Sequence, residues 1–407
     1  MIPIIRHIIY GDLAHLNSID FFICVITYFK KMEINNNDGR AKILAYYLPQ
    51  FEPNELNNKY YGEGFTEWTN VGKAKPLFRR HNQPKVPTDL GYYDLRIPEI
   101  AIKQAELARE AGVYGFAYWH YWWAGDMELN KPAERMLNNP NLDFPFCFAW
   151  ANENWYKKLW KIDKGKDILL KEQTYPGTED NRKHFEYCLP FFKDKRYVTF
   201  DGRPIFYVYN PLQFPKVNEF ICQWNSWIKE TGIAPSFYFV GLMRFNRDYE
   251  TIIKQGFDCV TPQQDARIGN DISSFANHVK VKLYSLFHDY SGTIRKQDYR
   301  KFLIYGFDKE YDSKETVAPL LIPNWDNTPR ASQRGIVYIH CNPDVWKQVA
   351  RMVLSGVKGK KNKLVFLKSW NEWAEGNYME PDLEFGKRNI EALGAAVEET
   401  RENVSNN

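Results

Sequence analysis

The stretch LVFLKSWNEWAEG, residues 364–376, joins a continuous apolar run to an aromatic segment that carries two carboxylates. An uninterrupted apolar run is typical of a strand that is buried on both faces of a parallel sheet. Seven similar runs precede it along the chain. The predicted strands are Ile43–Leu48, Val113–Trp119, Phe144–Ala149, Ile205–Tyr209, Phe237–Leu242, Cys259–Thr261, Ala318–Ile322 and Leu364–Trp370.

Helical patterns lie between these runs, with apolar residues at every third or fourth position. The clearest are Ile97–Ala111, Asn181–Phe192, Val217–Thr231 and Asp344–Ser355. Alternating strands and helices indicate an α/β protein, and eight such units predict a single (β/α)8 barrel of the TIM type. A doubly wound open sheet is the alternative. No G-x-G-x-x-G follows a predicted strand, so a Rossmann-type nucleotide site has no basis in the sequence.

Two long connections interrupt the alternation. Pro49–Pro87 follows the first strand and shows no helical pattern, and Asp265–Glu315 follows the sixth. Long loops at the carboxyl ends of strands commonly carry function. We therefore expect the functional site at that end of the barrel.

The chain of 407 residues has no low-complexity linker, so we predict one catalytic domain over residues 39–400. Residues 1–38 form an N-terminal extension that need not belong to the fold. Its apolar run Phe21–Phe29 has nine residues, whereas a spanning helix needs about 20, so stable membrane insertion is not expected. Asp20 before this run and lysines after it do not fit a signal peptide. An upstream start, with Met32 beginning the functional protein, is a further hypothesis.

Composition narrows the classes of function. A net charge of +4 leaves no electrostatic footprint for nucleic acid. The six cysteines include no C-x-x-C pair, which predicts reduced thiols and a cytoplasmic location. No two histidines have H-x-H or H-x-x-x-H spacing, so neither a metal nor another cofactor is predicted. Aromatic residues reach 16%, and their flat faces suit the stacking of sugar rings.

The strongest candidates for catalysis are Glu372 and Glu375, three residues apart at the end of the last strand. Cleavage of a glycosidic bond needs one carboxylic acid and one carboxylate, with aromatic rings nearby to hold the sugar. Trp370, Asn371 and Trp373 flank the pair and are candidates for substrate binding. The alternative is a pair of surface glutamates, but apolar surroundings favour a carboxyl group with a raised pKa.

Two other strand ends carry similar residues. In YGFAYWHYWW, residues 114–123, many rings belong to the core, but we expect Tyr118, His120 and Trp122 to reach the site. The third strand ends in Trp150, Asn152 and Glu153. Glu153 is a competing catalytic carboxylate.

The first and seventh strands complete the predicted rim. Tyr46 and Tyr47 end the first strand, and Trp325 and Asp326 follow the seventh. Rings next to polar groups suit a ligand rich in hydroxyls. Turn formation is the alternative for each cluster taken alone. Five clusters at five strand ends favour a binding site.

Five ordered segments resemble the WbsX-like family. They are residues 46–51, 64–71, 90–95, 325–330 and 370–376, and the similarity extends over about residues 40–398. This family is described as glycosyltransferases of bacterial surface polysaccharide gene clusters and is related to glycoside hydrolase family 99. The second segment adds Trp68 as a candidate for substrate binding.

The resemblance implies a mechanism. The related endo-α-mannosidases are (β/α)8 barrels with a Glu-Trp-x-Glu-Gly signature. It implies that Glu372 is the base that assists attack by the 2-hydroxyl of the substrate, that Glu375 is the general acid/base, and that configuration is retained through a 1,2-anhydro sugar. Ala374 stands where these hydrolases usually carry His.

Three functions remain open at this point. The family description implies sugar transfer in the assembly of a surface polysaccharide such as lipopolysaccharide, with a glycan acceptor and a nucleotide-sugar donor. The chain has no strict Asp-x-Asp motif of the kind that many such transferases use. Hydrolysis of an internal α-linkage is the second possibility, and a non-catalytic glycan-binding barrel is the third.

Overall fold

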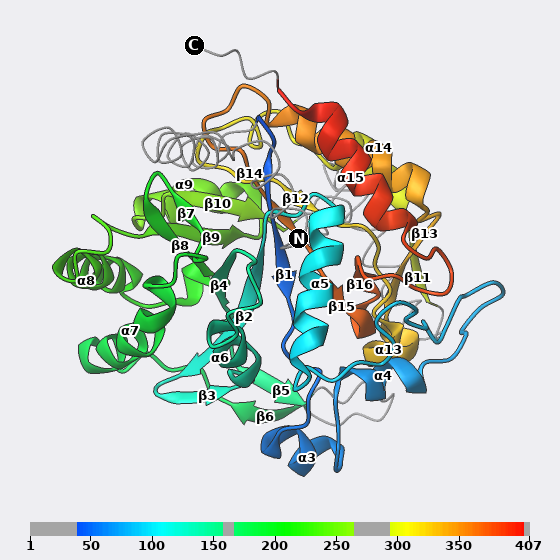
Figure 1. Ribbon diagram of the computed structural model, residues 1–407, viewed down its shortest axis with the longest axis horizontal. Helices are drawn as coiled ribbons and strands as arrows, with labels where there is room; N and C mark the ends of the chain where they lie inside the picture. The colour runs from blue at the N-terminus through cyan, green and yellow to red at the C-terminus, as the bar shows by residue number, and fades with distance from the viewer. Residues whose placement is uncertain (1–38, 158–166, 264–293, 403–407) are drawn as a thin grey trace, which may run out of the picture. The chain divides into compact units, whose positions relative to one another are not determined.

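The computed structural model describes residues 39–157, 167–263 and 294–402 (Figure 1). Ala41–Thr400 forms one compact unit built on a mostly parallel sheet. The predicted extension 1–38, with its apolar run, lies outside the described residues, as does most of the loop after the sixth strand.

Eight parallel strands make an almost closed barrel and confirm the predicted fold class. They run in the order β10-β9-β8-β4-β2-β1-β14-β12. Val260 of β10 bridges the two ends of this order, because its N–H donates to Thr316 O and its C=O accepts from Ala318 N, each across 2.8 Å. The barrel strands are β1 (Lys42–Tyr47), β2 (Gly115–Trp123), β4 (Phe146–Trp150), β8 (Arg203–Val208), β9 (Tyr238–Met243), β10 (Cys259–Pro262), β12 (Leu320–Leu321) and β14 (Leu364–Leu367).

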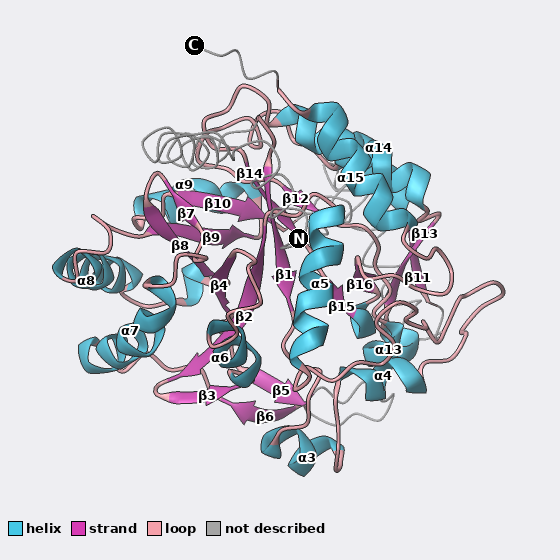
Figure 2. Cartoon of the chain, viewed as in Figure 1, coloured by secondary structure: helices cyan, strands magenta, loops and turns pink. Residues whose placement is uncertain are grey.

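Helices lie outside the ring of strands (Figure 2). The four predicted helices are confirmed to within three residues at each end. In the last of them, Asn342 caps the helix by accepting from Asp344 N and Val345 N, and the buried face carries Trp346 and Val349. Beyond the long connection after β1, the α-helices among the described residues of the unit are α5 (Pro98–Glu110), α6 (Lys131–Leu137), α7 (Thr178–Phe192), α8 (Val217–Glu230), α9 (Tyr249–Lys254), α12 (Phe302–Tyr305), α13 (Thr328–Ala331), α14 (Pro343–Gly356) and α15 (Arg388–Thr400).

The long connection after β1 departs from the prediction that it contains no helix. It forms α3 (Glu55–Tyr61) and α4 (Glu67–Lys73). Asn54 caps α3 by accepting from Asn57 N at 2.7 Å. Helices of seven residues complete only about two turns, so they show too few apolar repeats to be recognised from periodicity.

Short strands also form in the connections between the barrel elements. They are β3 (Asp126–Glu128) paired with β2, β5 (Trp155–Lys157) with β6 (Ile168–Lys171), β7 (Thr199–Phe200) with β8, β11 (Arg295–Asp298) with β13 (Ile336–Ile339), and β15 (Asn371–Glu372) with β16 (Asn377–Tyr378). No helix in the described ranges combines the length and the apolarity that crossing a bilayer requires.

Candidate active site

A cleft of about 860 Å³ opens at the carboxyl ends of the barrel strands. Every one of the eight strands, or the loop directly after it, contributes to its wall. The wall combines aromatic rings with carboxylates, amides and cationic groups. The residues from the strand ends are Tyr46, Trp119, Tyr121, Trp123, Glu153, Tyr207, Tyr209, Leu242, Gln263, Leu320, Trp325, Lys368, Glu372 and Glu375.

Stacked rings form two platforms in this cleft. Tyr46 and Trp119 stack with ring centroids 4.8 Å apart and an interplanar angle of 12°. Trp123 stacks on Trp155 at 5.6 Å and 13°, and Tyr121 stacks on the same Trp155 at 5.8 Å. Flat apolar faces with polar edges can hold sugar rings while leaving their hydroxyl groups to hydrogen bond.

One guanidinium group joins three carboxylates in the cleft. Arg330 Nη1 donates to Glu375 Oε1 at 2.6 Å, and Nη2 donates to Glu372 Oε2 at 3.2 Å and to Glu67 Oε1. Glu67 comes from α4, Arg330 from α13, and the other two glutamates from the loop after β14. Three carboxylates therefore share a single guanidinium group.

The pKa of Glu372 is raised by this environment. Burial, reinforced by the negative charges of Glu375 and Glu67, raises its pKa to about 7, although Arg330 and Lys368 act in the opposite direction. Trp119 Nε1 donates to Glu372 Oε1 at 3.1 Å. A carboxyl group that titrates near neutrality is suited to proton transfer at physiological pH.

The loop that carries Glu372 and Glu375 is fixed by its own backbone. Trp370 N donates to Tyr46 O at 2.7 Å, and Asp326 N donates to Glu375 O at 2.8 Å. Gly376 has φ = 56°, and a Cβ there would lie 2.7 Å from both the N and the Cβ of Asp326. Only glycine fits this close approach between the loops after β12 and β14.

A buried carboxylate supports this loop from behind. Glu380, 2% exposed, accepts from Trp373 Nε1 at 2.6 Å, from Gln104 Nε2 at 2.6 Å and from Tyr93 OH at 3.0 Å. Burial raises the pKa of Glu380 to about 7, although these three hydrogen bonds act in the opposite direction. Asn371 connects to the same network by donating to Tyr93 OH at 3.3 Å.

Five of the predicted site residues line the cleft: Tyr46, Glu153, Trp325, Glu372 and Glu375. A second set surrounds or supports the cleft without lining it. Trp68, Trp370 and Trp373 pack in the core, Asn371 binds the backbone of Leu48, Asp326 binds His81 and Gln83, and Asn152 binds Asn210 and Tyr175.

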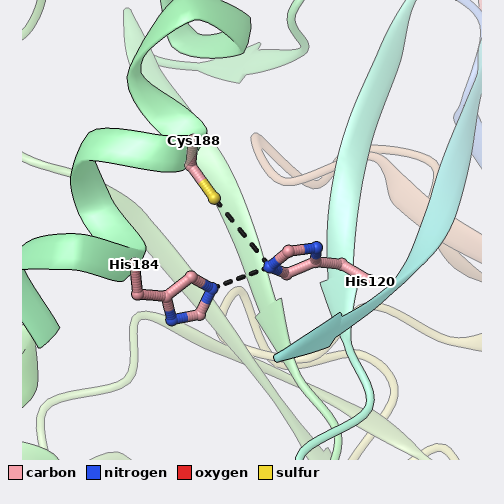
Figure 3. Close-up of side chains that lie close together, drawn as sticks. All are labelled: His120, His184 and Cys188. Atoms are coloured by element: carbon pink, nitrogen blue, oxygen red, sulfur yellow. Dashed lines mark hydrogen bonds between the residues drawn. The ribbon is translucent and has the colours of Figure 1, made fainter. Parts of the chain in front are cut away.

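The expected orientation of β2 is wrong and must be corrected. Tyr118, His120 and Trp122 face the outer helices, whereas Trp119, Tyr121 and Trp123 line the cleft. Neighbouring strand residues point to opposite faces, so an error of one position exchanges the whole set. His120 instead contacts His184 of α7 (Figure 3), and burial lowers the pKa of His120 to about 3.

The same correction applies to two other strands. Tyr47 points outward and donates to Gln104 Oε1 of α5 at 2.7 Å. Trp150 also points outward, where it packs edge-on against His184 at 4.7 Å. These rings belong to the layer between the barrel and its helices.

Sequence reasoning missed several groups of the cleft. Glu67 and Arg330 lie inside segments that carry the family resemblance, but nothing in either segment indicates that the two side chains meet. Trp119, Tyr121 and Trp123 are the sequence neighbours of the predicted Tyr118, His120 and Trp122. A test of both faces of β2 would have found them.

An aromatic cleft with grouped carboxylates at the carboxyl end of a (β/α)8 barrel is typical of carbohydrate-active enzymes. A sequence model of the family described as glycosyltransferase WbsX matches residues 43–393. The chain therefore belongs to the WbsX glycosyltransferase family, and this membership supports an enzyme that acts on glycans.

The similar curated proteins are uncharacterized proteins WxcX from two strains of Xanthomonas campestris pv. campestris. Each is 31% identical over 367 residues, which cover 88% of this chain and 50% of the relative. The chain thus spans about half the length of the curated relatives it matches.

Solved structures share the fold. A glycoside hydrolase-like protein aligns with a TM-score of 0.58 and 15% identity, covering 88% of this chain and 94% of its own. The GH99 endo-alpha-mannosidase from Bacteroides thetaiotaomicron aligns with a TM-score of 0.53 and 15% identity, covering 88% and 97%. These likenesses agree with the barrel assigned above.

Proposed function

We propose that the chain breaks glycosidic bonds of a polysaccharide or oligosaccharide, with Glu372 and Glu375 as the catalytic pair. The observation that carries this proposal is the shared contact of both carboxylates with Arg330 inside an aromatic cleft. The family description and the GH99 fold support a glycan as the substrate.

In this proposal Glu372 acts as the base. Its raised pKa makes the ionised carboxylate a stronger base for removing the proton of a sugar 2-hydroxyl. The 2-oxygen then forms a bond to the anomeric carbon while the bond to the leaving oxygen breaks. Water opens the resulting 1,2-anhydro sugar in a second step, and the proton returns from Glu372.

Glu375 acts as the acid in the first step and as the base in the second. Its Oε1 accepts from Arg330, so Oε2 would carry the proton that passes to the leaving oxygen. In the second step Glu375 takes a proton from the attacking water. The two glutamates end in their starting states, which closes the cycle.

The stacked rings would form the sugar subsites. A cleft of about 860 Å³ is at the large end of the range for ligand sites and suits several sugar units. We assign cleavage within a glycan chain, as by an endo-acting retaining α-glycosidase, because a cleft of this size suits several sugar units.

Sugar transfer is the second candidate, and the family description favours it. The same carboxylates could pass the sugar to a hydroxyl of a growing surface polysaccharide instead of to water. A nucleotide sugar would be the donor in the usual form of that reaction. A non-catalytic glycan-binding barrel is the remaining alternative.

The proposed setting is the cytoplasm. Cys147, Cys188 and Cys259 are buried free thiols. Free thiols persist in reducing compartments, and this supports the proposed location.

The deciding experiment incubates the protein with α-mannan and with polysaccharide from the source organism, with and without nucleotide sugars. Mass spectrometry of the products then separates the alternatives. Shortened glycans without a nucleotide sugar support bond cleavage. Growth that requires a nucleotide sugar supports transfer. Saturable binding without any product, equally strong in Glu372→Gln, supports a binding module.

A further inference from the structure

Three side chains with metal-binding atoms meet on the outer side of the barrel, away from the cleft. His120 comes from β2, and His184 and Cys188 stand one turn apart on α7. Figure 3 shows the two imidazole rings and the thiol pointing toward one another. No His-His spacing marks this group in the sequence, because the two helix residues form a His-x-x-x-Cys pair and the third residue comes from a distant strand.

The distances fit a single small ion. His120 Nε2 lies 2.8 Å from His184 Nε2 and 3.9 Å from Cys188 Sγ, and all three atoms lie within 4.8 Å of one another. An ion with bonds of about 2.0–2.3 Å joins ligand atoms up to about 4 Å apart, and both distances from His120 Nε2 lie within that limit. Both Nε2 atoms cannot carry protons that point at each other, so at least one lone pair already faces the centre of the group.

The surroundings are dry and aromatic. His120, His184 and Cys188 are exposed by 4%, 1% and 0%. Trp122 stacks on His184 at 4.6 Å, and Phe148 packs on His120 at 4.8 Å. A net charge left in such a place would be costly.

Charge and ligand number together select the ion. Two imidazoles and one thiolate suit soft transition metals rather than Mg²⁺ or Ca²⁺. With one thiolate, a monovalent ion gives a neutral complex, whereas Zn²⁺ would leave one buried positive charge. Zn²⁺ also takes four ligands in structural sites, and the group contains only three His, Cys or carboxylate side chains among the described residues.

We propose that His120, His184 and Cys188 form a binding site for monovalent copper. Binding replaces the thiol proton: Cys188 S–H and Cu⁺ give the Cu–thiolate and one proton released to solvent, with no change of oxidation state. The proton between the two rings moves to a ring Nδ1, so both Nε2 atoms can bind the ion.

The test uses the full chain under anaerobic conditions. One equivalent of Cu⁺, buffered by bicinchoninate, is equilibrated with the protein, and copper retained after desalting is counted. We expect one copper per chain. X-ray absorption at the copper edge should show one sulfur and two nitrogen neighbours, a result that requires no variant.

Matched variants separate this site from ordinary thiol binding. Cys222 lies on the exposed side of α8, so Cys222→Ser should retain the copper, whereas Cys188→Ser should bind it at least tenfold more weakly. Circular dichroism checks that both variants fold. If Cys188→Ser does not fold, the X-ray absorption spectrum of the wild type decides the question.

Three results would overturn the proposal. The first is no retained copper in the wild type, and the second is equal retention by Cys188→Ser and the wild type. The third is a parallel experiment in which Zn²⁺ is retained and Cu⁺ is not.

Discussion

Arg330 donates to Glu375 across 2.6 Å, and this bond ties the loop after β12 to the loop after β14. The other nitrogen of the same guanidinium reaches Glu372 and Glu67. One cation therefore positions two carboxylates that come from a single short loop and links them to a third from α4.

Replacing either member of the proposed catalytic pair should stop turnover and spare binding. We expect Glu372→Gln and Glu375→Gln each to lower kcat at least about 100-fold, because proton transfer contributes at least that much. Dissociation constants for the glycan should change little. Glu153→Gln is the matched control, since Glu153 lines the same cleft from the loop after β4, and its kcat should fall less than tenfold. Normal turnover in both pair variants would exclude the assigned roles.

The pH dependence of kcat/KM should reveal the role of Glu372. A base must be ionised, and the pKa of this group is raised to about 7. As pH falls below about 7, kcat/KM should therefore decline about tenfold per unit. A decline that begins as pH rises above 7 would instead make Glu372 the acid and reverse the two roles.

Arg330→Gln should move that acidic limb to higher pH. The guanidinium lowers the pKa of Glu372, so its removal raises this pKa further above 7. Lys368 acts in the same direction more weakly, so Lys368→Gln provides a graded control with a smaller alkaline shift. Identical pH profiles in Arg330→Gln and the wild type would show that Arg330 does not control the ionisation of Glu372.

Trp119→Phe should reduce kcat/KM about 10- to 100-fold. It removes the N–H that donates to Glu372 Oε1, and a hydrogen bond to a charged group contributes about 1.5–3 kcal/mol. Trp122→Phe makes the same chemical change on the opposite face of β2, where the N–H donates to Asp180 of α7. That control should retain near-normal kcat/KM. The reverse ranking would mean that the outer face of β2 meets the substrate.

This pair of tryptophans also shows where sequence reasoning reached its limit. Eight apolar runs alternating with helices were enough to predict the barrel, because eight β/α units match a closed parallel sheet covered by helices, and no glycine-rich motif favoured the open sheet. The sequence did not, however, predict which face of β2 points into the cleft. Aromatic residues occupy both faces of this strand, so no alternation of polar and apolar residues indicates which set points inward.

The loop after β14 illustrates a second limit. The motif marks its place and its two glutamates, but Trp370 and Trp373 turn into the core rather than toward the cleft. There Trp373 donates to Glu380, a buried carboxylate that no motif in the sequence marks. Likewise, Arg330 meets Glu67 across 263 positions of sequence, a contact that only the folded chain defines.

Glu380 should make the free energy of unfolding depend on pH in a recognisable window. Its pKa is about 7 in the folded protein and about 4.3 in an unfolded chain. Between these values the folded state holds a proton that the unfolded state has released. The contribution is therefore fully present below about pH 4.3 and is lost as pH rises through about 7. The maximum slope is about 1.4 kcal/mol per pH unit.

The measurement is urea unfolding from pH 4.5 to 8 in a Glu372→Gln background, which removes a second carboxyl group whose pKa is raised to about 7. Adding Glu380→Gln should flatten the decline of stability with pH. At the acid end of this range, adding Glu380→Gln should lower the free energy of unfolding the least, because the neutral amide of Gln resembles the protonated carboxyl group of Glu380. Equal slopes in the single and double variants would mean that Glu380 stays ionised in the folded protein. In that case the three donors around it would outweigh its burial, and the loop beneath Glu372 would rest on a permanent buried charge.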